Sequence, residues 1–232
     1  MEGRLYAEGE NYKKEFNPKD YQVTYYAFDS GATAENEILK FNLENLFQMF
    51  TAGGVGSNVL TDISIGPTIY QLLSACEIIT SDHGEQNLRE LGKCYDWCPT
   101  MQYVCELEGN RNRWQEKEAW LQKSVKRLLK CDVPPANCVL TLLTLEGACP
   151  SIDAYRVAMR GLVSLLKPGR HLATMAALHV KHYLVGLQFF GIYLKKKMVE
   201  AALQEAGCQM LGVTTTPLAA LKLAALMRAS AL

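Results

Sequence analysis

Two aspartates stand where short apolar runs of the sequence end. Asp62 closes the run VLTD and Asp82 closes EIITSD, twenty positions further along. If these runs are neighbouring parallel strands, both acids lie at the carboxyl edge of the sheet, where open α/β folds bind their ligands. An acid at the end of the second strand is well placed to bond the hydroxyls of a ribose. Either aspartate could instead cap a helix or a turn, and the spacing alone leaves that open.

The segment after Asp62 narrows the choice of a ribose-bearing ligand. A dinucleotide site favours Gly-x-Gly-x-x-Gly, so that a helix N-terminus can meet a pyrophosphate. Here ISIGPT has one glycine, Gly66, followed by Pro67, which suits the first turn of a helix. S-adenosylmethionine has no phosphate and needs close backbone approach and an acid for its ribose. The segment therefore fits S-adenosylmethionine better than NAD, which stays the minor alternative.

Composition and charge exclude several classes of protein. The chain has 232 residues, 49% of them hydrophobic, which suits one α/β domain with a sizeable core. Lys plus Arg and Asp plus Glu each number 24, so there is no basic footprint for nucleic acid or an anionic membrane. No apolar run approaches the roughly 20 residues of a membrane span, and the start lacks a signal-peptide core. We expect a cytoplasmic protein without nucleic-acid or membrane partners.

The metal-binding residue types do not assemble into a recognisable site. The eight cysteines are scattered through apolar or helical contexts, as in a cytosolic chain with reduced thiols. Cys94 and Cys98 form a close pair, but no second pair completes a zinc site. His179 and His182 form His-x-x-His without a neighbouring carboxylate, so we interpret them as pocket-rim or surface residues. We expect no bound metal.

Helical and strand patterns alternate along the chain, which predicts a mostly parallel sheet covered on both faces. Helices are expected over 33–50, after Pro67, over 113–129, over 152–166 and over 195–207, the last stopped by Gly207. Strands are expected over 59–63, 77–82, 101–107, 130–133, 138–146 and 167–178. The uninterrupted run CVLTLLTLE at 138–146 is typical of a central buried strand.

Several stretches resemble one known family. They are NPKDYQVTYY, TDISIGPTIYQLLSACE, VCELEGNRNRWQEKEA, LKCDV, CVLTLLTLEGACPSIDAYR and LLKPG, and the likeness runs from about Tyr12 to Gln209. This chain is similar to the small-molecule N-methyltransferases of nicotinamide, phenylethanolamine and indolethylamine (thioether), and most similar to the indolethylamine branch. The resemblance implies a class I S-adenosylmethionine-dependent methyltransferase fold: α/β, doubly wound, with an N-terminal helical cap. It implies one domain, with the cap over 1–50, the core over 51–211 and a divergent tail over 212–232.

The resemblance also assigns site residues. The cofactor set is Tyr21, Tyr26, Ser64, Ile65, Tyr70, Asp82, Asn87, Asp132, Val133 and Leu142, and the acceptor set is Tyr21 and Tyr183. Tyr21 and Tyr26 match lid tyrosines, whose aromatic faces suit a sulfonium cation. Asp82 matches the ribose acid, while Asp132 and Val133 match the adenine site. From the residues alone, the tyrosines could equally anchor the N-terminal helix in the core; by the family likeness we expect Tyr26 and Tyr70 to line the site and not to be buried.

The chemistry that the resemblance implies needs few side chains. A neutral amine attacks the sulfonium methyl in line, so positioning and desolvation carry most of the catalysis. No general base is required, and we assign no catalytic residue. The expected partner is a small-molecule amine, with thioethers as further acceptors, and the expected state is a monomer.

The sequence departs from the family in the cofactor loop. The family reads Asp-Ile-Gly-Ser-Gly-Pro-Thr where this chain has Ser64 and Ile65. A serine at positive φ costs roughly 1–2 kcal/mol, and Ile65 adds bulk, so the cofactor could bind about ten- to a thousandfold more weakly. From about Gly212 we expect a helical or irregular stretch in place of the family's last hairpin strand, which would leave the sheet without an edge strand. The alternative function is a weak or inactive family member that acts at most as a binding module.

Overall fold

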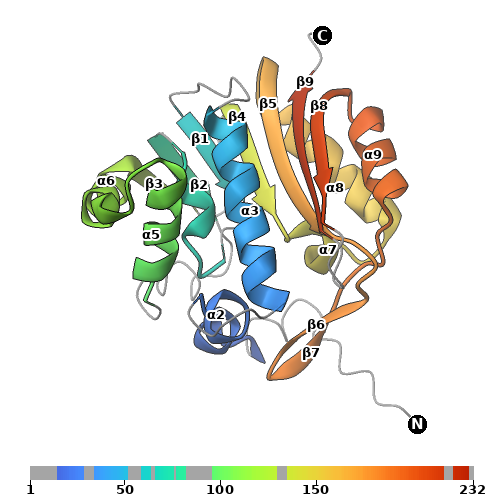
Figure 1. Ribbon diagram of the computed structural model, residues 1–232. Coiled ribbons are helices and arrows are strands. Elements are labelled where there is room, and N and C mark those ends of the chain that lie inside the picture. Colours follow the sequence, from blue (N-terminus) through green and yellow to red (C-terminus); the bar gives the residue numbers. More distant parts are fainter. Residues whose placement is uncertain are drawn as a thin grey trace.

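A seven-stranded sheet forms the middle of the molecule (Figure 1). The computed structural model describes residues 15–28, 34–51, 59–63, 66–75, 77–81, 96–129, 135–216 and 222–229. The strands of this sheet are β1 Val59–Ile63, β2 Glu77–Ser81, β3 Val125–Leu129, β4 Ala136–Leu142, β5 Leu166–Ala177, β8 Cys208–Thr215 and β9 Lys222–Ala229. A separate two-stranded sheet consists of β6 His182–Val185 and β7 Leu187–Phe190.

The strand order confirms the predicted doubly wound, mostly parallel sheet. The order is β3-β2-β1-β4-β5-β9-β8, with the first five strands parallel to one another and β9 antiparallel to both its neighbours. The chain winds outward from β1 to β3 and then returns to begin again at β4. The direction of winding therefore reverses between β1 and β4, which is where folds of this kind bind ligands beyond the strand ends. The predicted central position of β4 is confirmed.

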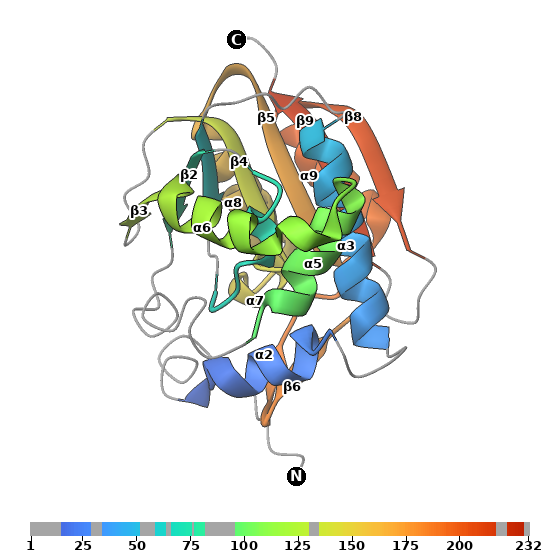
Figure 2. The same cartoon turned by 60° about the vertical axis from the view of Figure 1, so that its left-hand side comes forward.

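Helices cover both faces of the sheet (Figures 1 and 2). The helices are α2 Pro18–Tyr26, α3 Ala34–Thr51, α5 Cys98–Leu107, α6 Trp114–Ser124, α7 Leu145–Ala148, α8 Ile152–Ser164 and α9 Lys196–Glu205, with 3₁₀ turns η1 Tyr70–Leu72 and η2 Arg111–Arg113. One buried cluster joins the sheet to α2, α3 and α5, and a second joins it to α8 and α9. Side chains of β4 alternate between them: Cys138 and Leu140 belong to the first and Val139 to the second. None of the described helices is long and apolar enough to cross a membrane.

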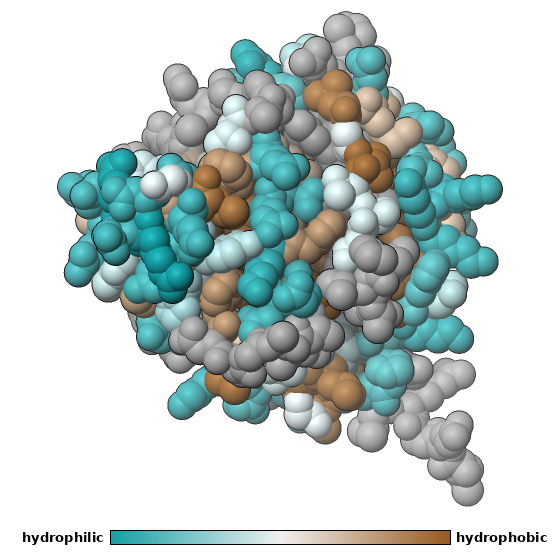
Figure 3. All heavy atoms as spheres, in the orientation of Figure 1, coloured by the Kyte–Doolittle hydropathy of each residue, from teal (hydrophilic) through white to brown (hydrophobic). Residues whose placement is uncertain are grey.

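The helices with the clearest sequence patterns lie where they were predicted. On α3, the predicted apolar stripe of Leu39, Leu43 and Leu46 is buried, and the outer side of the helix is hydrophilic in Figure 3. On α8, the Ser151 hydroxyl accepts a hydrogen bond from the Ala154 N–H (3.2 Å) and caps the helix start. Gly207 follows α9 with φ +81°, as a glycine C-terminal stop requires.

Three local predictions were wrong. The helix predicted over 113–129 ends at Ser124, and Val125–Leu129 form strand β3 instead. The strand predicted over 130–133 lies outside the described residues. Residues 101–107, predicted as a strand, belong to α5. Their alternation also fits a helical stripe, because Met101, Val104 and Cys105 follow the i, i+3, i+4 spacing and are buried together. After Pro67 the chain forms only the short turn η1 and not a full helix, although Leu72 and Leu73 are buried as that pattern required.

The expected loss of the last strands is also wrong. Strand β8 lies at the edge of the sheet, and β9 inserts between β5 and β8, with its register running from His171↔Arg228 to Ala177↔Lys222. The Leu- and Ala-rich run at 222–229 has no alternating pattern and favours a helix by propensity. Backbone pairing with a neighbour on each side overrides that weak preference.

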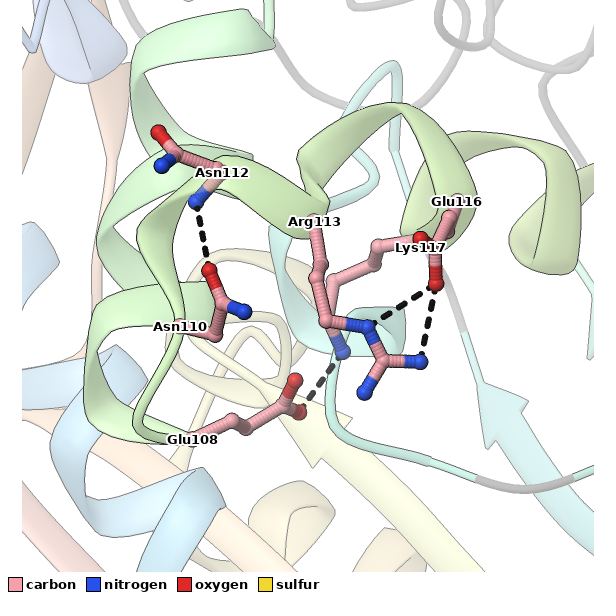
Figure 4. Close-up of polar contacts among 6 residues, drawn as sticks. All are labelled: Glu108, Asn110, Asn112, Arg113, Glu116 and Lys117. Carbon is pink, nitrogen blue, oxygen red and sulfur yellow. Dashed lines mark hydrogen bonds and ion pairs between the residues drawn. The ribbon is translucent and has the colours of Figure 1, made fainter.

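The junction between α5 and α6, whose polar contacts are drawn in Figure 4, is also bonded to the turn that follows β1. Lys117 Nζ donates to Glu108 (2.6 Å) and to the backbone C=O of Leu73 (2.9 Å), with its side chain only 11% exposed. Nearby, the Arg113 guanidinium pairs with Glu116 (2.8 Å). The Lys117 contact is the one that matters for the site, because it fixes the backbone next to η1.

Candidate functional site

The carboxyl ends of the parallel strands are covered by α2, α7 and the β6–β7 hairpin (Figures 1 and 2). Strand β1 runs into the Gly66–Pro67 turn and η1, while β4 ends at Leu142 and runs into α7. These are the two strands between which the winding reverses. The elements that could hold a ligand therefore come from distant parts of the chain and meet at one end of the sheet.

The turn after β1 is braced by a buried polar network. Asp62, 1% exposed, accepts a hydrogen bond from Gln71 Nε2 (3.4 Å), and Gln71 Oε1 accepts one from the Thr68 hydroxyl (3.0 Å). Gly66 has φ +62°, a conformation that favours glycine. The predicted position of Asp62 at the strand end is confirmed, and its carboxylate contributes to holding the turn in place.

Three tyrosines of the predicted cofactor set meet above this turn. The Tyr26 ring packs against Tyr70 (centroids 5.1 Å apart) and Trp97 (5.8 Å), and the Tyr21 and Tyr26 hydroxyls are 3.2 Å apart. Tyr26 is 5% and Tyr70 2% exposed, so the expectation that they avoid the core is wrong. They are buried because α2 lies directly on the turn.

Burial also sets the protonation of these phenols. Burial raises the pKa of Tyr21 well above the ordinary value, and the neighbouring Tyr26 raises it further. Burial also raises the pKa of Tyr26 well above the ordinary value, and here Tyr70 adds to the effect. The pKa of Tyr70 is raised chiefly by burial as well. All three remain neutral at physiological pH and can donate or accept hydrogen bonds, but they cannot serve as bases.

Helix α2 is held in place at its start and on both sides. The Asn17 side chain caps it by accepting from the Lys19 N–H (2.9 Å). Gln22, fully buried, donates from Nε2 to the C=O of Pro67. The Tyr25 hydroxyl donates to the C=O of Leu184 (2.9 Å) and accepts from the Leu184 N–H (3.0 Å). The helix thus contacts both the turn after β1 and the hairpin.

Tyr183, the predicted acceptor residue, lies between the hairpin and α7. Its ring stacks on Phe189 (centroids 5.3 Å apart, 19° between planes). A Cβ placed on Gly147 would lie 3.5 Å from Tyr183 Cε1, so the glycine allows the ring to lie close to α7. Burial is the main cause of the raised pKa of Tyr183, and the neighbouring Tyr25 raises it further. Tyr21 and Tyr183 both pack against the cluster of Phe16, Val185 and Phe189, which joins the two tyrosines.

The end of β4 has an unusual backbone. Leu142 is buried, and Leu143 has φ +52°, a conformation that costs a leucine about 1 kcal/mol or more. Its N–H donates to the C=O of Met175 (2.9 Å). Glu146 on α7 accepts the Ala177 N–H at Oε1 (2.8 Å), and its C=O accepts the Ile192 N–H (2.7 Å). These bonds hold α7 against the end of β5.

Sequence reasoning missed three residues of this region: Gln22, Tyr25 and Glu146. A signal existed for Tyr25, because Tyr21 and Tyr25 are four residues apart and share a helix face, with rings 5.3 Å apart. Glu146 comes after strand β4 in the sequence, as Asp82 comes after β2. Nothing in the sequence indicates that Gln22 reaches the turn.

The structure thus brings together Tyr21, Tyr26 and Tyr70 above the turn, with Leu142 and Tyr183 at the same end of the sheet. The remaining predicted residues lie outside the described residues: Ser64, Ile65, Asp82, Asn87, Asp132 and Val133. Asp82 directly follows Ser81, which pairs with Ile63 at the end of β1. His179 and His182 are exposed, as surface residues should be. Within the described part of the chain, no group of three His, Cys, Asp or Glu residues could hold a metal.

Comparison with known proteins gives consistent matches. Residues 4–225 match the profile of the NNMT/PNMT/TEMT family. The chain is 55% identical to indolethylamine N-methyltransferase of Mus musculus, over 91% of this chain and 89% of that protein. It is 47% identical to nicotinamide N-methyltransferase of Homo sapiens, over 85% and 84%. Its fold is similar to that of magnesium protoporphyrin IX methyltransferase from Synechocystis PCC 6803 with bound SAH (TM-score 0.64, 11% identity, 95% of this chain and 97% of that one).

Proposed function

We propose, from the premise that this chain belongs to the NNMT/PNMT/TEMT family, that it transfers a methyl group from S-adenosylmethionine to the nitrogen of a small amine. The observation that carries the proposal is the 55% identity to an indolethylamine N-methyltransferase along 91% of the chain. The aromatic-lined end of the sheet supports it, because tyrosine faces attract a sulfonium cation. From the same relative we propose that the acceptor is an indolethylamine-like amine.

The residues of this chain fit S-adenosylmethionine at the strand ends. Tyr21, Tyr26 and Tyr70 would hold its methionine end together with Ser64, Ile65 and Leu142. Asp82 and Asn87 would bond its ribose, and Asp132 and Val133 its adenine. When bound, the cofactor supplies an electrophilic methyl group on a sulfonium. The buried tyrosine cluster provides the low-dielectric surroundings in which a cation–π contact with that sulfonium is strongest.

The tyrosines around the acceptor position the amine and exclude water. Tyr21 and Tyr183 keep neutral phenols, because burial raises the pKa of each. The oxygen of a neutral phenol can accept a hydrogen bond from the amine N–H, which leaves the nitrogen lone pair available for attack. Orientation and desolvation then lower the barrier without a general base.

The setting we propose is a monomer in the cytoplasm with a small-molecule acceptor. The balanced charge of the chain, 24 basic and 24 acidic residues, supports a small acceptor over a nucleic acid. The eight cysteines are consistent with a reducing compartment, where thiols stay unpaired.

Ligand-induced stabilisation tests the proposal directly. S-adenosylhomocysteine at about 100 times its Kd should stabilise the purified protein by about 2.7 kcal/mol and raise its Tm by several degrees. ATP, which shares the adenosine part, serves as the control and should give no comparable shift. Tryptamine should then be methylated when S-adenosylmethionine is supplied. Absence of both the shift and the methylation would exclude the proposed function.

A further inference from the structure

One side chain joins the lid helix to the hairpin that carries the acceptor tyrosine. Tyr25 on α2 bonds Leu184 twice, donating to its C=O (2.9 Å) and accepting from its N–H (3.0 Å), across 159 positions of sequence. Figures 1 and 2 both show α2 lying beside β6. The phenol therefore occupies both backbone hydrogen-bonding groups of a single residue.

The geometry of an antiparallel pair explains why Leu184 is available. Leu184 lies opposite Gln188 in the β6–β7 register. In such a ladder the N–H and C=O of one residue point to the same side, alternately toward and away from the partner strand. Since both groups of Leu184 meet Tyr25, they point away from β7. The Tyr25 hydroxyl thus replaces the backbone of a third strand.

The hairpin needs such support. It forms a two-stranded sheet separate from the large one, and an isolated two-stranded hairpin is only marginally stable in water. Leu184 and Leu187 are 56% and 37% exposed, so its tip contributes little to a core. Its packing rests on Val185 and Phe189, which contact Phe16 near the start of α2. Contacts with the α2 region therefore contribute to where the hairpin lies, together with its packing against α7.

The acceptor tyrosine follows the hairpin backbone. Tyr183 precedes Leu184 directly and points to the opposite face of β6 from it, toward α7 and Phe189. Holding the backbone of Leu184 in place therefore also holds the Cα of Tyr183, from which its side chain extends. On its other side, α2 holds the turn after β1 through Gln22 and Pro67 and through Tyr26 and Tyr70.

We propose that Tyr25 is a positioning residue that couples the seating of α2 on the turn after β1 to the placement of Tyr183, so that cofactor binding strengthens acceptor binding. This inference rests on the proposed function. A cofactor that contacts the turn and the lid tyrosines favours the seated position of α2. Because Tyr25 bonds the hairpin, the seated position of α2 also favours the hairpin position that places Tyr183 for the acceptor. By thermodynamic linkage, the acceptor strengthens cofactor binding by the same factor.

The test is the substitution Tyr25→Phe, which keeps the ring and removes both hydrogen bonds. Calorimetric titration measures the affinity for tryptamine with and without saturating S-adenosylhomocysteine. In the natural chain the ligand should tighten tryptamine binding by about tenfold, and in Tyr25→Phe by less than about threefold. The affinity for S-adenosylhomocysteine alone should change by less than about twofold, because Tyr26 and Gln22 remain. Hydrogen exchange of the Leu184 amide should become at least about tenfold faster.

A matched control removes a phenol bond elsewhere. Tyr103 donates to Glu44 (2.5 Å) and joins α5 to α3, so Tyr103→Phe should keep the full tightening and the slow Leu184 exchange. If Tyr25→Phe retains the tightening, the coupling is overturned while the proposed function stands. If the natural chain binds no S-adenosylhomocysteine, the proposed function fails, and the coupling is overturned with it.

Discussion

The two faces of the sheet are covered by different kinds of side chain. Against α2, α3 and α5 the buried set includes aromatic and polar groups: Tyr26, Tyr70, Trp97, Gln22, Gln71 and Asp62. Against α8 and α9 it is mainly aliphatic: Leu172, Leu178, Leu194, Val199, Ala202 and Leu203. The first face needs hydrogen-bond partners for its buried groups, and several come from segments distant in sequence, as in the bond from Gln22 to Pro67.

We interpret the aliphatic face as the scaffold of the fold and the aromatic and polar face as the one that carries the candidate site. A buried polar group destabilises the fold unless it is paired, so an aliphatic face is the simpler way to gain stability. The aromatic and polar face has the groups that a cationic cofactor and an amine can use, and it includes the strained Leu143 at the end of β4. Changes on the second face should therefore alter stability without altering ligand affinity, whereas changes to the polar site groups of the first face should chiefly alter ligand affinity.

The largest effect should come from a cavity in the second face. Leu203 on α9 is fully buried, so Leu203→Ala should lower the free energy of unfolding by about 3 kcal/mol. Urea denaturation measures this loss, and Val157→Ala on the exposed side of α8 should change stability by less than about 0.5 kcal/mol. Calorimetry below the unfolding transition should find the affinity for S-adenosylhomocysteine unchanged. A tenfold loss of affinity would show that the two faces are not separate.

The reverse effect should come from the acid that follows β2. Asp82→Ala should weaken the binding of S-adenosylhomocysteine by about 2 kcal/mol, or roughly thirtyfold, because the proposed charged acceptor for the ribose hydroxyls is lost. At about 100 times the Kd of the natural chain, the stabilisation by the ligand should then fall from about 2.7 to about 0.9 kcal/mol, and the thermal shift should fall with it. Asp153→Ala removes an exposed acid from α8 on the other face and should leave the shift intact. An unchanged shift in Asp82→Ala would exclude the ribose assignment.

The sequence predicted the sheet where pattern and burial agree. VLTDI at 59–63 is short, apolar and bounded by turn residues, and it is β1; the stripe of Leu39, Leu43 and Leu46 predicted α3. The run at 222–229 could not be assigned, because β9 is defined by its partners β5 and β8, which a local pattern does not contain. The helix at 98–107 was missed because a short apolar run fits both periods.

The site was predictable by residue and less so by contact. The resemblance selected Tyr21, Tyr26 and Tyr70, which do meet at one place. Their burial depends on α2 lying on the turn after β1, a long-range contact that no spacing encodes. The two bonds of Tyr25 to Leu184 likewise depend on how the hairpin folds back.

A smaller effect is expected from restoring the family's loop next to the first face. Ser64→Gly with Ile65→Ser should tighten the binding of S-adenosylhomocysteine by about tenfold, or ~1.4 kcal/mol, because the β-branched side chain that we propose to crowd the methionine end is removed. Calorimetry measures the gain, and tryptamine methylation should rise with it. The neighbouring Gly66, with φ +62°, stays unchanged. Unchanged affinity would mean that the natural loop already accepts both residues.

The smallest effect concerns a thiol of β4 that belongs to the first face. Burial raises the pKa of Cys138 to about 12 from its ordinary 9.0. The folded state therefore keeps this proton while the unfolded chain loses it above about pH 9, so its contribution to stability is present below that pH and lost progressively toward pH 12. From pH 8 to 9.5 the loss should be about 0.8 kcal/mol from this group. Cys138→Val keeps an apolar side chain of similar size and should flatten the fall in urea stability by that amount, whereas an equally steep fall in the variant would show that the buried tyrosines or other thiols cause it.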